Sequence, residues 1–272
     1  DRAKALGGRA QDYHRNGFVH DAGPTVITAP FMFEELFTLF GERFEDHVKL
    51  VPLTPWYRFY FSGGEQFNYG GTLEETLSEI ERIEPADIAG YLALVEHSKK
   101  IFNVGFTELS AQPFHQFSTM AAQVPRLLKL RSHETVWQMV SRFLSNPLLR
   151  QAFTIQPLLV GGNPFETTSI YGLIHYLERA YGVFFAMGGT GRLIQALGDL
   201  MQRQGIKVEL ETTVKTLIVK EGTAVGVKLA DGSQRNSDLV VSDIDPTFLY
   251  EHMIEQSAQT TVVKLKRKAA HY

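Results

Sequence analysis

Two clusters of small residues near the start of the chain constrain its fold and its ligand most strongly. Gly7 and Gly8 precede Arg9, and a second small-residue turn, residues 21–25, follows a short apolar run. Glycine lacks a Cβ and tolerates backbone conformations closed to other residues, so the chain can approach a bulky group closely. Arginine presents a planar set of donors that matches phosphate. A lone Gly-Gly-Arg is usually a surface turn, but the pair of clusters predicts a large phosphate-bearing cofactor lying along this segment.

The composition excludes several other classes of protein. The sequence is 44% hydrophobic and 21% charged, the balance of an ordinary globular protein. Its net charge of −3 gives no support to nucleic-acid binding, so we expect no nucleic-acid partner. Without cysteine there are no disulfides or thiolate metal sites, and the nine histidines show no metal-ligand spacing, so no metal is expected. No Gly-x-Ser-x-Gly motif frames a hydrolase nucleophile, and no run of about 18 apolar residues predicts a membrane-spanning helix.

Hydrophobic periodicity changes between helical and strand patterns along the chain. Helical spacing and capping residues such as Thr72 and Glu75 predict helices over these segments: 31–40, 72–104 (two helices), 133–155, 168–180 and 191–204. Aromatic residues predict a hairpin over 51–68, which is either a sheet edge or a wall beside an apolar substrate. A strand is predicted within 181–187, and four more, with a turn at Asp231-Gly232, over 207–210, 214–220, 224–230 and 237–241.

The segment 114–131 has the pattern of an amphipathic helix with a kink at Pro125. Its apolar side includes Val124, Leu127 and Leu128, and the opposite side includes basic residues. Such a helix either packs on the core of its own protein or lies in the interface of a membrane. Sequence periodicity alone leaves both interpretations open.

Several short motifs follow one another in a fixed order: 7–10 with 18–28, 158–165 (LLVGGNPF), 169–171 (SIY), 188–191 (GGTG) and 240–243 (VVSD). In this order they resemble the bacterial-type phytoene desaturases, the carotenoid desaturase family of amine-oxidase-like FAD flavoproteins. The similarity extends over the whole chain and is more specific than any single motif. It implies an α/β (α+β) class: a partial FAD/NAD(P)-binding Rossmann-like flavoprotein fold with a mixed-sheet substrate domain and a helical, membrane-associated insertion.

The resemblance also implies an order of domains. The expected segments are 1–30 (remainder of the FAD-binding domain), 31–72 and 156–187 (two parts of the substrate domain), 73–155 (helical, membrane-associated region), 188–245 (helix and β-meander of the FAD-binding domain) and 246–272 (start of the return to the substrate domain). No strand with a Gly-x-Gly-x-x-Gly turn precedes Asp1. We therefore expect the chain to be an internal fragment of a longer enzyme.

For function, the resemblance implies FAD-dependent desaturation of phytoene, stepwise towards lycopene, with hydride transfer to the flavin. Because a carotene dissolves in the bilayer, we expect a cytoplasmic enzyme attached peripherally to a membrane surface, and we leave homo-oligomerisation open. A related carotenoid isomerase, or a desaturase of the diapophytoene or neurosporene type, is the nearest alternative. A non-catalytic, membrane-binding fragment is the alternative outside enzymes.

The same resemblance assigns residues to a cofactor site and a substrate site. For the cofactor it implies Gly7, Gly8, Arg9, Ala10, Gly23, Pro24, Thr25, Val214 and Asp243. For the apolar substrate we expect Trp56, Phe165, Tyr171 and Phe185, although each residue type is equally ordinary in a core. No catalytic base is identified, because the chain has Ser118-Thr119 where some relatives have an acidic residue. The turn 188–191 lacks the Lys-Ser/Thr of a Walker loop, so it is either a tight strand-to-helix turn or a cofactor contact.

Overall fold

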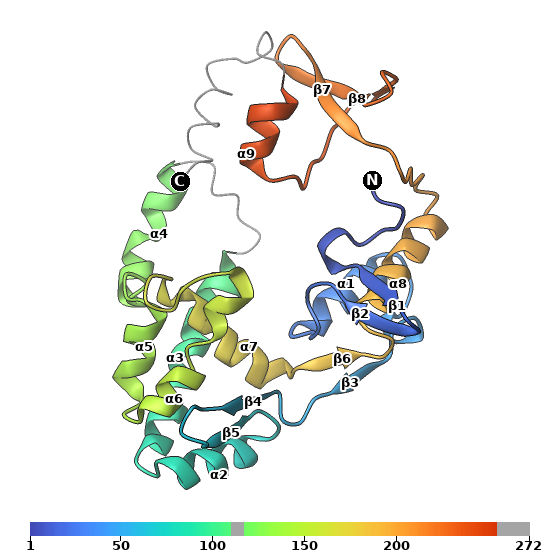
Figure 1. Ribbon diagram of the computed structural model, residues 1–272. Helices are drawn as coiled ribbons and strands as arrows, with labels where there is room; N and C mark the ends of the chain where they lie inside the picture. The colour runs from blue at the N-terminus through green and yellow to red at the C-terminus, as the bar shows by residue number, and fades with distance from the viewer. Residues whose placement is uncertain (110–116, 255–272) are drawn as a thin grey trace. The chain divides into compact units, whose positions relative to one another are not determined.

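A computed structural model describes residues 1–109 and 117–254, with the side chains of 117–120 left out of the description. The chain divides into two compact units (Figure 1). The first unit joins the two ends of the chain, Asp1–Gly23 and Thr190–Tyr272, and the second is the continuous segment Pro24–Gly189. The first part of the predicted helix over 114–131, and most of the predicted domain 246–272, lie outside the described residues.

The first unit combines a hairpin, a long helix and a three-stranded sheet. Its elements are η1 (Gly8–Ala10), β1 (Asp12–Arg15), β2 (Phe18–Asp21), α8 (Thr190–Arg203), β7 (Val214–Lys220), β8 (Thr223–Leu229), β9 (Gln234–Asn236), α9 (Pro246–Phe248) and η6 (Leu249–Met253). The sheet is antiparallel, in the order β7-β8-β9. Helix α8 buries Leu193, Ala196 and Leu200 at helical spacing, and Gly205 follows it in the left-handed conformation. This helix and the turn at Asp231-Gly232 are confirmed.

Two of the four predicted strands in this region are wrong. Residues 207–210 form no strand; single hydrogen bonds join this part of the chain to its start, from the Asp1 amine to the Glu209 carbonyl and from the Glu211 amide to the Ala3 carbonyl. Residues 237–241 form none either. There the Ser237 hydroxyl bonds within its own segment, to the Leu239 carbonyl, and the side chains of Leu239 and Val241 remain exposed.

The second unit is mainly helical, with two small antiparallel pairs of strands. Its strands are β3 (Leu50–Pro52) with β6 (Phe184–Ala186), and β4 (Tyr57–Tyr60) with β5 (Gln66–Tyr69). Its helices are α1 (Pro30–Leu39), α2 (Leu73–Ile83), α3 (Asp87–Phe102), α4 (Phe117–Lys129), α5 (Val136–Phe143), α6 (Pro147–Ala152) and α7 (Leu173–Tyr181). Short 3₁₀ helices and one π-helical segment (η3) are also described in this unit: η2 (Phe44–Asp46), η3 (Asn103–Glu108), η4 (Gln156–Val160) and η5 (Ser169–Gly172).

Capping residues explain where the helices of this unit begin. The hydroxyl of Thr72 accepts from the Glu75 amide, and the Glu75 carboxylate accepts from the Thr72 amide, so the predicted capping box is confirmed. The segment 133–155 contains two helices rather than one. Asn146 caps a new helix with its side chain, and Pro147 follows it at the first helical position.

The core of the second unit is aromatic. The β4–β5 hairpin contributes Phe67 and Tyr69, which are fully buried, and α3 contributes Tyr91. Helices α3 and α7 pack side by side (Figure 1). Burying rings of this size supplies the main stabilisation of such a unit. Within the described ranges, no helix is both long enough and apolar enough to traverse a bilayer.

Candidate functional site

The first cluster of small residues and the start of the second, up to Gly23, come together in the first unit. Gly7 (φ 114°) and Gly8 (φ 51°) have left-handed backbones that lead into the short helix η1. Gly23 lies against this helix, because a Cβ at that position would collide with the carbonyl oxygen of Arg9. Only glycine fits such a close approach of two backbones. The structure therefore brings together the predicted residues Gly7, Gly8, Arg9 and Gly23, with open space beside Gly8.

The side chain of Arg9 is available to a ligand. It is exposed, and no described residue forms a salt bridge or hydrogen bond with its guanidinium group. A free guanidinium beside a glycine-lined backbone fits one phosphate of a dinucleotide cofactor, with bidentate donors for its oxygens. Arg9 and its neighbouring glycines thus fit the group that the sequence predicts.

The turn at 188–191 is not a free anion site. The first amide of α8, on Thr190, donates to Oδ1 of Asp21 at 2.8 Å. Gly191 lies so close to the Asp12 carboxylate that a Cβ there would collide with it. Two carboxylates of the chain itself therefore occupy the positive end of this helix and would repel a phosphate. The sequence places Asp21 only in a small-residue turn, and nothing local indicates its bond to the Thr190 amide.

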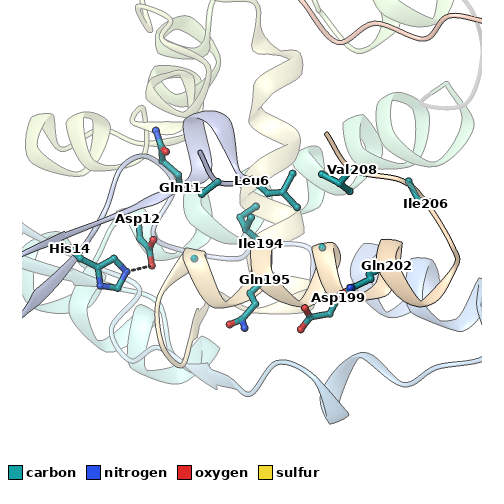
Figure 2. A pocket seen from close by; sticks show the side chains of 13 residues that line it. Leu6, Gln11, Asp12, His14, Ile194, Gln195, Asp199, Gln202, Ile206 and Val208 are labelled. Carbon is teal, nitrogen blue, oxygen red and sulfur yellow. Dashed lines mark ion pairs between the residues drawn. The ribbon is translucent and has the colours of Figure 1, made fainter. Parts of the chain in front are cut away.

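A hollow runs along α8 in the first unit (Figure 2). It has a volume of about 590 Å³, and it is lined by Leu6, Gln11, Asp12, His14, Ile194, Gln195, Asp199, Gln202, Ile206 and Val208, with three smaller residues. Nε2 of His14 lies 3.5 Å from Oδ2 of Asp12. None of the predicted cofactor residues lines this hollow, and its two carboxylates disfavour a phosphate.

The remaining predicted cofactor residues are dispersed. Val214 begins β7, where it pairs with Leu229, and Asp243 is exposed in the segment between β9 and α9. Pro24 and Thr25 begin the second unit. Ala10 ends η1 and donates its amide to the Gly7 carbonyl at 2.8 Å. A role for these residues in cofactor binding stays a prediction.

The four predicted substrate residues do not share one place in the second unit. Trp56 is buried in the aromatic core, and Tyr171 packs half-buried against that core. Phe185 lies in β6, opposite Val51 of β3. Phe165 is exposed, with its ring 4.8 Å from the ring of Trp137. Their contact with a substrate also stays a prediction.

The second unit contains a buried polar network that was not predicted from the sequence. The Tyr57 hydroxyl donates to Oε1 of Glu178 at 2.7 Å, while Oε2 of Glu178 is buried without a described partner. Burial raises the pKa of Glu178 to about 7 and raises that of Tyr57, so the tyrosine remains the donor. Burial lowers the pKa of nearby His175 to about 4. Helical spacing was the available signal, because Glu178 follows Ile174 by four residues on the buried face of α7.

Arg179 ties this network to the hairpin and to two further helices. Its guanidinium group donates to the Gly71 carbonyl and the Thr76 hydroxyl, each at 2.8 Å, and to the Tyr91 hydroxyl at 3.1 Å. The same group lies 4.5 Å from the centre of the Trp56 ring. One side chain therefore joins α7 to the hairpin, α2 and α3.

Comparison with known proteins extends the geometric evidence. The sequence model of flavin containing amine oxidoreductases matches residues 2–271. A lycopene-forming phytoene desaturase of Pseudescherichia vulneris is 42% identical over 265 residues, 97% of this chain and 54% of the relative. The enzyme of the same name from Pantoea ananas is 40% identical over 250 residues, covering 92% of this chain and 51% of the relative. The chain thus spans about half the length of these relatives.

A solved structure supports the fold independently of close sequence similarity. An oxidoreductase from Methanosarcina mazei superposes with a TM-score of 0.65 at 15% identity, covering all of this chain and 58% of its own. The expected α/β flavoprotein fold is therefore confirmed.

Proposed function

Because this chain belongs to the family of flavin-containing amine oxidoreductases, we propose that it is part of an FAD-dependent carotenoid desaturase that acts on phytoene. The proposed reaction introduces double bonds stepwise towards lycopene. The two lycopene-forming relatives, similar over more than nine-tenths of this chain, support it. The exposed guanidinium of Arg9 beside the open backbone of Gly8 is the structural observation that supports flavin binding most directly.

The proposed cofactor contacts follow from that geometry. Arg9 would bind a phosphate of FAD, and the backbone at Gly8, where no atom lies within 4 Å of a Cβ position, would let the nucleotide approach without a side chain in the way. When bound, the flavin supplies the hydride acceptor. A carotene offers no polar groups, so the protein must select it by the shape of an apolar surface, for which Tyr171 and Phe185 are our candidates.

Replacing Arg9 with Ala should weaken FAD binding about 10- to 100-fold, because charge-assisted hydrogen bonds to a phosphate contribute about 1.5–3 kcal/mol. Flavin absorbance of the full-length protein after gel filtration measures the retained cofactor. Lys220→Ala is the matched control, since Lys220 is an exposed cation at the end of β7 in the same unit. Equal flavin content in Arg9→Ala and Lys220→Ala would contradict the assignment of Arg9.

The substrate also determines where the enzyme must work. A carotene is dissolved in the bilayer, so we propose that the protein is cytoplasmic and attaches peripherally to a membrane. Helix α4 supports this proposal, because Val124 and Leu128 are exposed on it, with the basic residues Arg126 and Lys129 nearby. Exposed apolar side chains beside cations are typical of helices that lie in a membrane interface.

A further inference from the structure

A short loop of the second unit exposes large apolar side chains. It comprises η4 and the turn that follows it, residues 156–165, and is called the apolar loop below. The side chain of Leu158 is 76% exposed, and Leu159, Val160 and Phe165 are each more than half exposed. Single exposed apolar residues are ordinary, but four within eight residues form a patch that normally has a partner.

The apolar loop borders a hollow of about 320 Å³ whose chemistry restricts that partner. The walls include Trp137, Thr154, Ile155, Leu158, Pro164 and Phe165, and no charged residue lines the hollow. The whole segment 151–165 contains no Asp, Glu, Lys or Arg. Gln151 and Thr154 are the polar side chains of this lining and the rest of it is apolar, so the hollow favours a hydrocarbon occupant.

The region around the apolar loop carries an excess of basic residues, in contrast to the rest of the chain. Residues 117–165 contain five basic residues and one acidic residue; Glu108, which pairs with Arg126, and the exposed Glu166 directly after Phe165 reduce the local excess to two, within a chain of net charge −3. Arg131 and Arg142 share the single acid, Glu134, and Arg126 pairs with Glu108. The surplus of cations around an uncharged apolar loop complements an anionic lipid surface, with headgroups outside and acyl chains inside.

Hydrogen bonds hold the basic segment and the apolar loop side by side. The Trp137 amide donates to the Pro164 carbonyl at 3.0 Å, and the Val136 amide donates to the Thr167 carbonyl at 2.9 Å. The Ser169 hydroxyl donates to the carbonyl of Arg131 at 3.0 Å. These bonds join the segment just after α4 to the segment that contains the loop. The apolar and the basic features therefore form one surface of the second unit.

We propose that the apolar loop inserts into the surface of an anionic phospholipid bilayer, with Leu158, Leu159 and Phe165 among the acyl chains and one chain end in the hollow. The proposal deepens the membrane attachment proposed above and does not depend on the desaturation reaction. It adds a second contact to the one at α4 and fixes which face of the unit meets the lipid.

The test is flotation of the full-length protein with vesicles of phosphatidylcholine and phosphatidylglycerol. Leu158→Asp/Leu159→Asp should bind at least about tenfold more weakly, because two side chains lose their transfer into hydrocarbon. Leu159→Asp alone should show a smaller loss. Leu39→Asp is the matched control, since Leu39 in α1 is 74% exposed in the same unit, and its binding should be unchanged. Replacing phosphatidylglycerol with phosphatidylcholine should weaken the binding of the unaltered protein.

Three results would overturn the proposal: no binding of the unaltered protein, equal binding of the double variant, or an equal loss in Leu39→Asp. The thermal unfolding midpoint separates lipid contact from folding, and it should not change because both leucines are exposed. A drop in that midpoint without loss of vesicle binding would show that protein covers the loop, which also overturns the proposal. Flavin content is measured on the same samples, so a failure of the proposed function would appear there and not in flotation.

Discussion

Replacing Arg179 with Met should lower the free energy of unfolding of the second unit by about 3–5 kcal/mol, because it breaks a partly buried charged network while preserving the length of the side chain. The change leaves the Gly71 carbonyl, the Thr76 hydroxyl and the Tyr91 hydroxyl without their shared donor. It also removes the cation that lies over the ring of Trp56. Urea unfolding followed by circular dichroism measures the loss.

Arg58→Met is the control for this experiment. Arg58 lies in strand β4 of the hairpin that Arg179 contacts, but its side chain is exposed. Its Nε donates to the Asn68 side chain at 2.8 Å. A change of about 0.5 kcal/mol or less is expected for such a surface position. If Arg179→Met and Arg58→Met destabilise the protein equally, then Arg179 does not join α7 to the hairpin in the way that the structure indicates.

The second large effect concerns pH. Burial raises the pKa of Glu178 to about 7 from an ordinary value of 4.5, so the native state favours the protonated carboxyl. The resulting stabilisation is complete below about pH 4.5, declines as the pH rises through 7, and amounts to about 3 kcal/mol over that window. Glu178→Gln keeps an acceptor for the Tyr57 hydroxyl but cannot ionise. The difference in the free energy of unfolding between the variant and the unaltered protein should therefore shift by about 3 kcal/mol in favour of the variant between pH 5 and pH 8.

Urea unfolding of both proteins between pH 5 and pH 8 measures this difference. The comparison isolates Glu178 from His175, which is present in both proteins. Burial lowers the pKa of His175 to about 4, so its contribution has the opposite sign and is lost as the pH falls from about 6.5. A difference between the two proteins that stays constant with pH would contradict the buried state of Glu178.

Local signals in the sequence were sufficient for most of the helices and for the first part of the site. The Thr72–Glu75 capping box and the glycine after α8 are short-range features, and each lies where it was predicted. The strand predicted over 207–210 is wrong because alternation alone does not supply a neighbouring strand, and none of the described strands pairs with this segment. A strand forms only where a second strand lies beside it, and the fold of the whole chain determines where that second strand lies.

The contacts in the Arg9 region and in the Glu178 network differ in the same way: some join residues that are close in sequence, and others join residues that are far apart. The contact between Gly23 and Arg9 joins residues that are close in sequence; the spacing of their clusters predicted a cofactor along this segment but not this contact. The Tyr57–Glu178 hydrogen bond joins residues 121 positions apart, so helical spacing could mark Glu178 as buried without identifying its partner. The carboxylates at the start of α8 were also invisible locally, since Asp21 and Thr190 meet only through the fold.

Product analysis tests the proposed desaturation most directly. The full-length protein is expressed in a bacterial host that accumulates phytoene, and the carotenoids are separated by chromatography and identified by absorbance. Flavin-dependent desaturation predicts that phytoene declines and that lycopene appears, with less product from Arg9→Ala than from Lys220→Ala. Unchanged phytoene, or geometric isomers with no new double bonds, would contradict it.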